Sequence, residues 1–179
     1  MISFEEVNKY CKKRQVVFVG SSYFNNLEVN KENLTNNLQK LIYNRSAERL
    51  NIESALDFLK NQVFPLEPSE IFVNIGDEDL KSAGFDLQHF IDNYEWMLLN
   101  IHRSCKDCII YITSVVSVSP AVKQVNKKLF ELAKDTGCTF VDFTGVKKDR
   151  DSYKKILNII KQYLQPSSFE RNGTMQVSC

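Results

Sequence analysis

The 179-residue sequence lacks the features that mark membrane, secreted and nucleic-acid-binding proteins. No apolar run approaches the ~20 residues of a membrane-spanning helix, and residues 1–6 have neither the basic start nor the apolar core of a signal peptide. The 23 basic and 22 acidic residues give a net charge of +1, too little to attract nucleic acid or an anionic membrane over long range. We therefore expect a cytoplasmic protein that binds no nucleic acid and does not span a membrane.

The cysteines are too few and too scattered for a disulfide framework. Cys105 and Cys108 have the spacing of a redox pair, but they precede an expected strand, whereas a thioredoxin-like pair opens a helix. One such pair, with two histidines elsewhere, also makes a poor zinc site. We expect reduced thiols, no metal and no cofactor, and the role of this pair stays open. The five cysteines are Cys11, Cys105, Cys108, Cys138 and Cys179.

The chain does contain one stretch, residues 16–27, that is typical of a ligand site. Four β-branched and aromatic residues, Val16–Val19, form a buried-strand pattern that breaks at Gly20 into Ser21 and Ser22. Ligands of open α/β sheets bind at the carboxyl ends of the strands, which is where these two serines are expected. An ordinary strand followed by a polar turn is the other interpretation of the same residues.

Short apolar runs alternate with amphipathic helical patterns along the rest of the chain. Near-continuous apolar strands separated by helices predict an α/β fold, a three-layer α/β/α sandwich around a five-stranded parallel sheet of order 2-1-3-4-5, flavodoxin-like. With neither a repeat nor a linker, residues 1–165 are expected to form one domain, with an N-terminal helix within 1–14 and a polar tail at 166–179. Strands are expected near 15–20, 40–44, 70–75, 108–114 and 139–143, and helices over 4–14, 30–40, 53–63, 87–102, 123–134 and 151–164.

From Val16 to Leu164 the order of these blocks resembles the SGNH, or GDSL-type, esterase and lipase family. Gly20-Ser21-Ser22 is similar to the family's Gly-Asp-Ser block, and Asn44-Arg45-Ser46 to its Asn-Arg-Gly-like block. The segment from Ile75 to Leu80 stands where the family has Gly-x-Asn-Asp. The resemblance implies the flavodoxin-like SGNH-hydrolase fold, with Ser22 at the position of the nucleophile.

The catalytic groups that the resemblance implies are only partly present. In the family, a histidine removes the serine proton and an aspartate three residues earlier orients that histidine. Here this block falls near Thr144 to Lys147, and residues 140–164 contain no histidine. Glu78 stands at the oxyanion asparagine, where an ionised carboxylate can only accept hydrogen bonds. Arg49 stands at the oxyanion glycine, and Ser21 replaces the aspartate of Gly-Asp-Ser.

We therefore expect an SGNH-hydrolase-like protein whose triad is incomplete. Such a protein is catalytically impaired, or is a non-catalytic binding or accessory domain, and its expected ligand is a small acyl or carbohydrate molecule. Arg49 and Glu78 are expected either to pair across the former oxyanion site, because two unpaired charges in a semi-buried cleft would be costly, or both to point into solvent. The residues assigned to the pocket beside Ser22 are Gly20, Ser21, Arg49, Gly76, Glu78 and Lys147.

Two other functions remain open at this point. One is an active serine esterase on small acyl or acetylated-sugar esters with an unrecognised base, and the other is a purely structural or interaction module. His89 and His102 fall off the buried stripe of their helix, so both are expected to be solvated. Candidate bases are Glu78, Asp149, Asp151, His89 and His102.

Overall fold

A computed structural model describes residues 4–27, 40–146 and 152–164. Five parallel strands form one sheet in the order β2-β1-β3-β4-β5. Strand β1 lies between β2 and the central strand β3, with Phe18 opposite both Asn44 and Phe72. The predicted sheet and its strand order are confirmed. The strands are β1 (Val16–Gly20), β2 (Ile42–Asn44), β3 (Glu70–Asn74), β4 (Ile109–Thr113) and β5 (Thr139–Val141).

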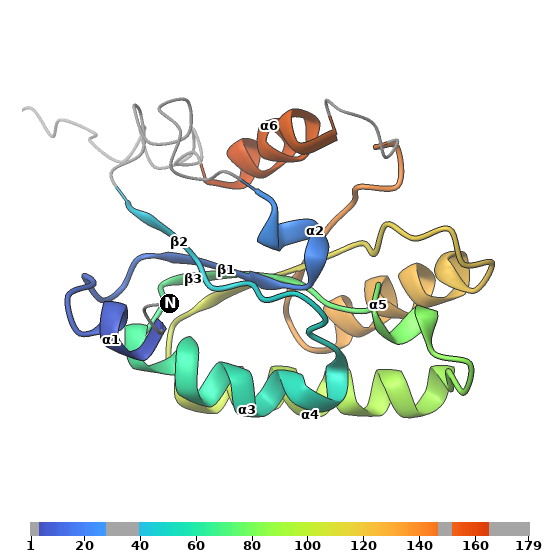
Figure 1. Ribbon diagram of the computed structural model, residues 1–179, viewed down its shortest axis with the longest axis horizontal. Coiled ribbons are helices and arrows are strands. Elements are labelled where there is room, and N and C mark those ends of the chain that lie inside the picture. Colours follow the sequence, from blue (N-terminus) through green and yellow to red (C-terminus); the bar gives the residue numbers. More distant parts are fainter. Residues whose placement is uncertain (1–3, 28–39, 147–151, 165–179) are drawn as a thin grey trace, which may run out of the picture.

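Helices cover both faces of this sheet (Figure 1). One face carries α3, α4 and α5, and the other carries α2 and α6. The predicted three-layer α/β/α sandwich is therefore confirmed. The helices are α1 (Phe4–Asn8), α2 (Ser22–Asn25), α3 (Ile52–Gln62), α4 (Leu87–Ser104), α5 (Val122–Asp135) and α6 (Ser152–Leu164), with 3₁₀ turns η1 (Phe64–Leu66) and η2 (Asp79–Lys81).

Most strand residues are apolar because both faces of the sheet are covered by helices. Val17 and Val19 of β1 pack under α3, α4 and α5. Val16 and Phe18 face the other way and join a cluster beneath α2 and α6. This second cluster is rich in aromatic rings, among them Phe72 stacked on a neighbouring tyrosine with 4.2 Å between centroids. Ser22 thus sits where the buried end of β1 meets the helical layer.

The N-terminal helix is shorter than the expected span of 4–14. It ends at Asn8, and Arg14 adopts a left-handed backbone conformation with φ 58°. Past Asn8 the N–H groups of Tyr10 and Cys11 donate to carbonyls three residues earlier, as in turns. The Arg14 N–H then donates to the carbonyls of Leu66 and Glu67, which directs the chain into β1. The expected helix over 30–40, apart from Lys40, and the tail at 166–179 lie outside the described residues.

No helix among the described residues combines the length and apolar composition that a bilayer crossing requires.

Candidate functional site

The end of β1 packs tightly against β3 and fixes the start of the site. A methyl group on Gly20 would lie 2.5 Å from the backbone oxygen of Asn74 and 3.2 Å from Cβ of Phe24, so only glycine fits there. Ser21 is fully buried, and its N–H donates to the same Asn74 oxygen at 3.1 Å. Ser22 follows as the first residue of α2. These contacts hold Ser22 just beyond the carboxyl end of β1, as predicted.

The block at the end of β2 supports α2 from one side. The Asn44 amide donates to the carbonyl oxygens of Phe24 at 2.8 Å and Leu27 at 3.3 Å, and its oxygen accepts from the N–H of Ser46 at 3.1 Å. The neighbouring Arg45 is buried, with its guanidinium over two aromatic rings and its Nε bonded to an asparagine of α1. This block therefore positions the helix that carries Ser22.

The turn after β3 brings a carboxylate and an amine to the same edge. Gly76 has φ 133°, and a Cβ there would lie 2.8 Å from Val115 Cγ2, so both conformation and space require glycine. The chain then enters η2, and Glu78 is the residue before this 3₁₀ turn. One turn of 3₁₀ helix aligns residues three apart, which places the side chain of Lys81 beside that of Glu78.

Ser22, Glu78 and Lys81 form one hydrogen-bonded network. Ser22 Oγ donates to Glu78 Oε1 at 2.9 Å, and Lys81 Nζ donates to the same oxygen at 2.6 Å and to Asp77 Oδ2 at 3.1 Å. The bond from Lys81, with a smaller contribution from Ser22, holds the pKa of Glu78 below its usual value although burial opposes this. Glu78 in turn raises the pKa of Lys81. At neutral pH the serine proton therefore points to an ionised carboxylate that already carries a cation.

The expected ion pair between Arg49 and Glu78 is wrong. Among the described residues Arg49 forms no ion pair, and Lys81 takes the place that was assigned to it. Arg49 is exposed and acts on Glu78 only through its charge, which helps to lower the carboxylate pKa. Lys81 pairs with Glu78 because one turn of η2 places its amine beside that carboxylate. The backbone of Arg49 has φ 60°, a left-handed conformation that glycine adopts readily. This agrees with the match of Arg49 to the oxyanion glycine in the sequence comparison with the family.

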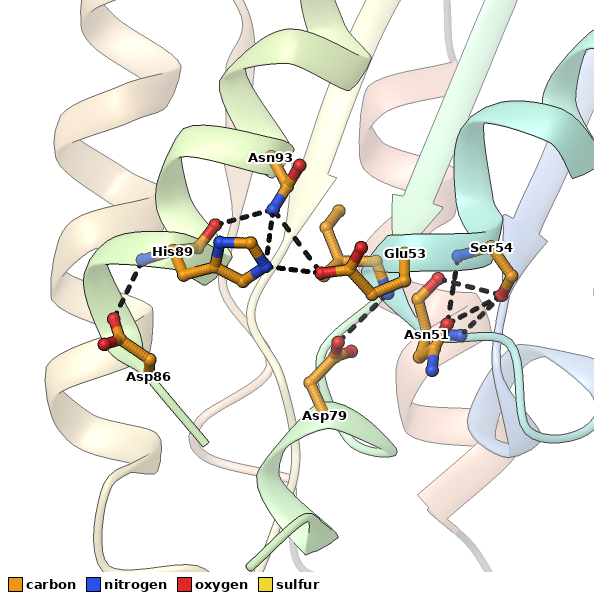
Figure 2. Close-up of polar contacts among 8 residues, drawn as sticks. Asn51, Glu53, Ser54, Asp79, Asp86, His89 and Asn93 are labelled. Atoms are coloured by element: carbon orange, nitrogen blue, oxygen red, sulfur yellow. Dashed lines mark hydrogen bonds and ion pairs between the residues drawn. The ribbon is translucent and has the colours of Figure 1, made fainter. Parts of the chain in front are cut away.

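His89 belongs to a separate polar cluster that joins α3 to α4 (Figure 2). Its Nε2 lies 2.6 Å from Glu53 Oε1, and Asn93 bridges the two groups. Asp79 lies beside the first turn of α3, where its Oδ1 accepts a hydrogen bond of 3.0 Å from the N–H of Ile52. Burial raises the pKa of Asp79, although the hydrogen bond from Ile52 acts to lower it. Within the described residues none of these side chains bonds to Ser22.

His102 lies near the other end of α4. Its Nε2 is 3.2 Å from the carbonyl oxygen of Thr136, and like His89 it is exposed. The prediction that both histidines are solvated is confirmed. Since neither one bonds to Ser22, the geometry favours neither as its base.

The remaining candidate residues belong to the segment before α6. Lys147, Asp149 and Asp151 lie outside the described residues. The flanks of this segment pack against α2, because the ring of Phe143 lies 6.4 Å from that of Phe24 and Tyr153 lies 6.0 Å from Tyr23. Asp149 and Asp151 therefore stay predictions as bases, and Lys147 stays a prediction as a pocket residue.

The site contains side chains that sequence reasoning missed. Lys81 is the most important, and the spacing of Glu78 and Lys81 at i and i+3 could have indicated the pair. Asn74 was assigned only to a strand, yet its buried amide donates to Thr113 Oγ1 at 2.7 Å and to the Ser114 carbonyl at 3.2 Å. These bonds fasten the ends of β3 and β4 together below the site, and no local sequence pattern marks them.

The cysteines in the described residues are free thiols. Burial raises the pKa of Cys105 to about 11 and that of Cys108 to about 12. Such thiols are almost entirely protonated at neutral pH, whereas thiol exchange requires the thiolate. The chemistry of the pair therefore gives no support to a redox role.

A scan against protein-family models finds no match, and a search of curated proteins also finds none. Solved structures, in contrast, are clearly similar. A GDSL-like lipase from Bacteroides thetaiotaomicron superposes with a TM-score of 0.75 at 15% identity, over 90% of this chain and 98% of that one. The lipase/acylhydrolase from Enterococcus faecalis gives 0.68 at 15% identity, over 86% and 98%.

A catalytic mutant of an acetylxylan esterase from Geobacillus stearothermophilus is also similar, with a TM-score of 0.67 at 9% identity over 86% of this chain and 95% of that one. At such identities the likeness establishes the fold alone. The chain has the α/β/α fold of the SGNH/GDSL hydrolases, which the resemblance of its sequence blocks had implied.

Proposed function

We propose that this protein binds a small acyl or carbohydrate ligand at a hydrolase-type serine site that has lost most of its catalytic power. The observation that carries the proposal is the network of Ser22, Glu78 and Lys81. At the position where the resemblance implies a neutral amide donor, the chain has a carboxylate bound to a lysine. An ionised carboxylate beside the serine opposes the negative charge that develops on an ester oxygen during attack.

The size of the missing contributions supports impaired catalysis. Loss of a triad base typically costs about 10⁶ in turnover, and loss of one oxyanion donor costs roughly 10² to 10³. These effects are not additive within one site, but the first alone would bring a typical esterase close to the uncatalysed rate. Glu78 is a weak substitute for histidine, because its lowered pKa makes it a poorer proton acceptor than an ordinary carboxylate.

The same groups suit a hydroxyl-rich or acylated ligand. Ser22 can donate or accept a hydrogen bond, and Glu78 can accept one from a sugar hydroxyl in place of the serine. Lys81 is shared between the carboxylates of Glu78 and Asp77, so acidic groups outnumber the bonded lysine beside Ser22, which disfavours an anionic ligand. Similar folds named lipase, acylhydrolase and acetylxylan esterase support this ligand class.

An active serine esterase is the second candidate, and one distance favours it. Glu78 Oε1 lies 2.9 Å from Ser22 Oγ, within the reach that a general base requires. In this account Glu78 takes the serine proton as Oγ attacks the acyl carbon, and returns it to the leaving alcohol. Lys81 would weaken that base, so turnover should rise when Lys81 is replaced by an uncharged residue.

The experiment uses tetra-O-acetyl-xylopyranose as the acylated probe and xylose as its unacylated control. Binding is followed by shifts of the backbone amides of Ser21–Asn25 and Gly76–Lys81 in ¹⁵N NMR spectra. Release of acetate is followed in the same samples by ¹H NMR. We expect saturable shifts confined to these two segments, with acetate released at the buffer rate.

Two results would contradict the binding proposal in different ways. Saturable acetate release that is lost in both Ser22→Ala and Glu78→Gln would establish the esterase with Glu78 as its base. An absence of shifts with both probes would remove acyl and carbohydrate ligands and leave the fold as an interaction module. His89→Gln is the matched control, because His89 lies in a different cluster.

A further inference from the structure

A second candidate site lies at the edge of the sheet opposite Ser22. A cleft of about 260 Å³ is formed there by the segments that lead into three strands of the sheet. Arg14 precedes β1, Glu67 and Pro68 precede β3, and residues 104–106 connect α4 to β4. Because all strands are parallel, these segments meet at the amino edge, whereas Ser22 follows the carboxyl end of β1.

Positive charge is concentrated in this cleft. Arg14, Arg103 and Lys106 line it, and all three are exposed. Its one carboxylate, Glu67, is already neutralised by Lys13 at 2.5 Å. The cleft therefore has a local excess of cations in a protein whose net charge is only +1.

These cations differ from several lysines of the described surface that have carboxylate partners. Lys40 pairs with Glu70 at 2.6 Å, and Lys128 pairs with Glu131 at 3.0 Å. Within the described residues, Arg14, Arg103 and Lys106 form no ion pair. Cations held together in a concave surface without counter-charges repel one another, and an anion that enters between them relieves this repulsion.

The end of α4 explains only part of this arrangement. The negative end of a helix dipole attracts basic residues to the last turn, which accounts for Arg103, and Lys106 follows directly after the C-cap residue Cys105. Arg14 comes from a distant part of the sequence. It is held at the cleft in a left-handed conformation, with its N–H shared between the carbonyls of Leu66 and Glu67. The third cation is thus brought to the cleft by the tertiary fold and not by the helix.

We propose that the cleft lined by Arg14, Arg103 and Lys106 binds a small phosphate-bearing anion. Guanidinium groups match phosphate oxygens with paired N–H donors, and the Ser104 hydroxyl on the same wall supplies a further donor. The volume of about 260 Å³ lies below the ~300–1,000 Å³ of clefts for larger ligands, so it fits a phosphate or diphosphate group with little attached. This site is independent of the function proposed for Ser22.

The single tryptophan of the chain provides a reporter for this site. Trp96 is 50% exposed, and the guanidinium carbon of Arg103 lies 5.8 Å from the centre of its ring. An anion that binds Arg103 changes the environment of this ring and therefore its fluorescence. Titration of the full chain with inorganic pyrophosphate at low ionic strength should give a saturable fluorescence change with matching heat in calorimetry. Potassium chloride at equal ionic strength controls for screening.

Charge-neutralising variants test the assignment. Arg14→Gln and Arg103→Gln should each weaken pyrophosphate binding about tenfold or more, read by calorimetry because Arg103→Gln also alters the reporter. Lys60→Gln, which removes an exposed lysine paired with Asp57, is the control and should leave affinity within about twofold of the wild type. Melting temperatures verify that each variant is folded. No saturable binding, or equal weakening by all three variants, would overturn the proposal, since the latter indicates attraction to overall charge alone.

Discussion

Ser22 Oγ donates a hydrogen bond to Glu78 Oε1 at 2.9 Å, across 56 residues of sequence. This bond joins the ends of β1 and β3 at the edge of the sheet where α/β proteins bind their ligands. Lys81 donates to the same carboxylate oxygen, so the serine hydroxyl and the lysine amine share one acceptor.

Removal of Lys81 should raise the pKa of Glu78. In the wild type the pKa of Glu78 is lower in the folded protein than in the unfolded chain, where it is about 4.3. Ionised Glu78 therefore stabilises the fold fully when the pH is above the unfolded pKa, and this stabilisation is lost as the pH falls through the folded pKa. Lys81→Gln should therefore flatten the acid limb of stability against pH. The measurement is urea unfolding between pH 3 and 7, with a ¹³C NMR titration of the Glu78 carboxyl. An unchanged Glu78 titration would contradict the network.

Arg49→Gly should cost no stability, although it removes a large side chain. A left-handed conformation costs an ordinary residue about 1–2 kcal/mol, which glycine avoids, while glycine loses about 0.5–1 kcal/mol through its freer unfolded chain. We expect a change between zero and a gain of about 1.5 kcal/mol by urea unfolding. Arg49→Ala keeps the strained backbone and serves as the control. A similar loss in both variants would show that the Arg49 side chain itself holds the loop, and a glycine variant less stable than the alanine variant would contradict the backbone argument.

Gly20→Ala should destabilise the protein, because the added methyl group meets the backbone oxygen of Asn74 at 2.5 Å. Overpacking of this kind costs about 1–3 kcal/mol. Gly84→Ala is the matched control, since no atom lies within 4 Å of its added Cβ. Thermal unfolding should separate the two variants clearly. Equal melting temperatures would mean that β1 and β3 are not as close at this edge as described.

His89→Gln should have little effect on stability or on the Ser22 site. The bond between His89 and Glu53 joins two exposed side chains, and exposed pairs contribute only roughly 0–1 kcal/mol. We expect a small loss of stability in urea and an unchanged rate of ester hydrolysis. Saturable wild-type turnover that falls tenfold or more in this variant would identify His89 as the missing base and revise the site.

The sequence was sufficient to predict the sheet and the place of Ser22, because both depend on strong local patterns. Apolar runs such as Val16–Val19 mark buried strands, and Gly20 marks the turn. The helix before β1 was predicted too long, since it ends at Asn8 and the chain then turns until the Arg14 N–H bonds to carbonyls of the distant η1 region. No local pattern contains that information.

Within the site, the sequence identified the residues better than their partners. Glu78 was correctly placed beside Ser22, but its partner was predicted to be Arg49. The predicted pair joined two distant segments, whereas the pair with Lys81 forms within a single turn of 3₁₀ helix. The expectation that Glu78 requires a positively charged partner was correct, and Lys81, three residues along the chain, is that partner.

The central claim is that Ser22 is not an efficient nucleophile. Its most direct test is the initial rate of hydrolysis of p-nitrophenyl acetate and butyrate by the wild type, Ser22→Ala and Glu78→Gln, with Asp149→Asn and Asp151→Asn included to cover the remaining candidate bases. The account predicts no saturable turnover above the buffer rate, and rates that are the same for all five proteins. Saturable turnover that disappears with Ser22→Ala would contradict it, and the carboxylate variant that also loses turnover would identify the base.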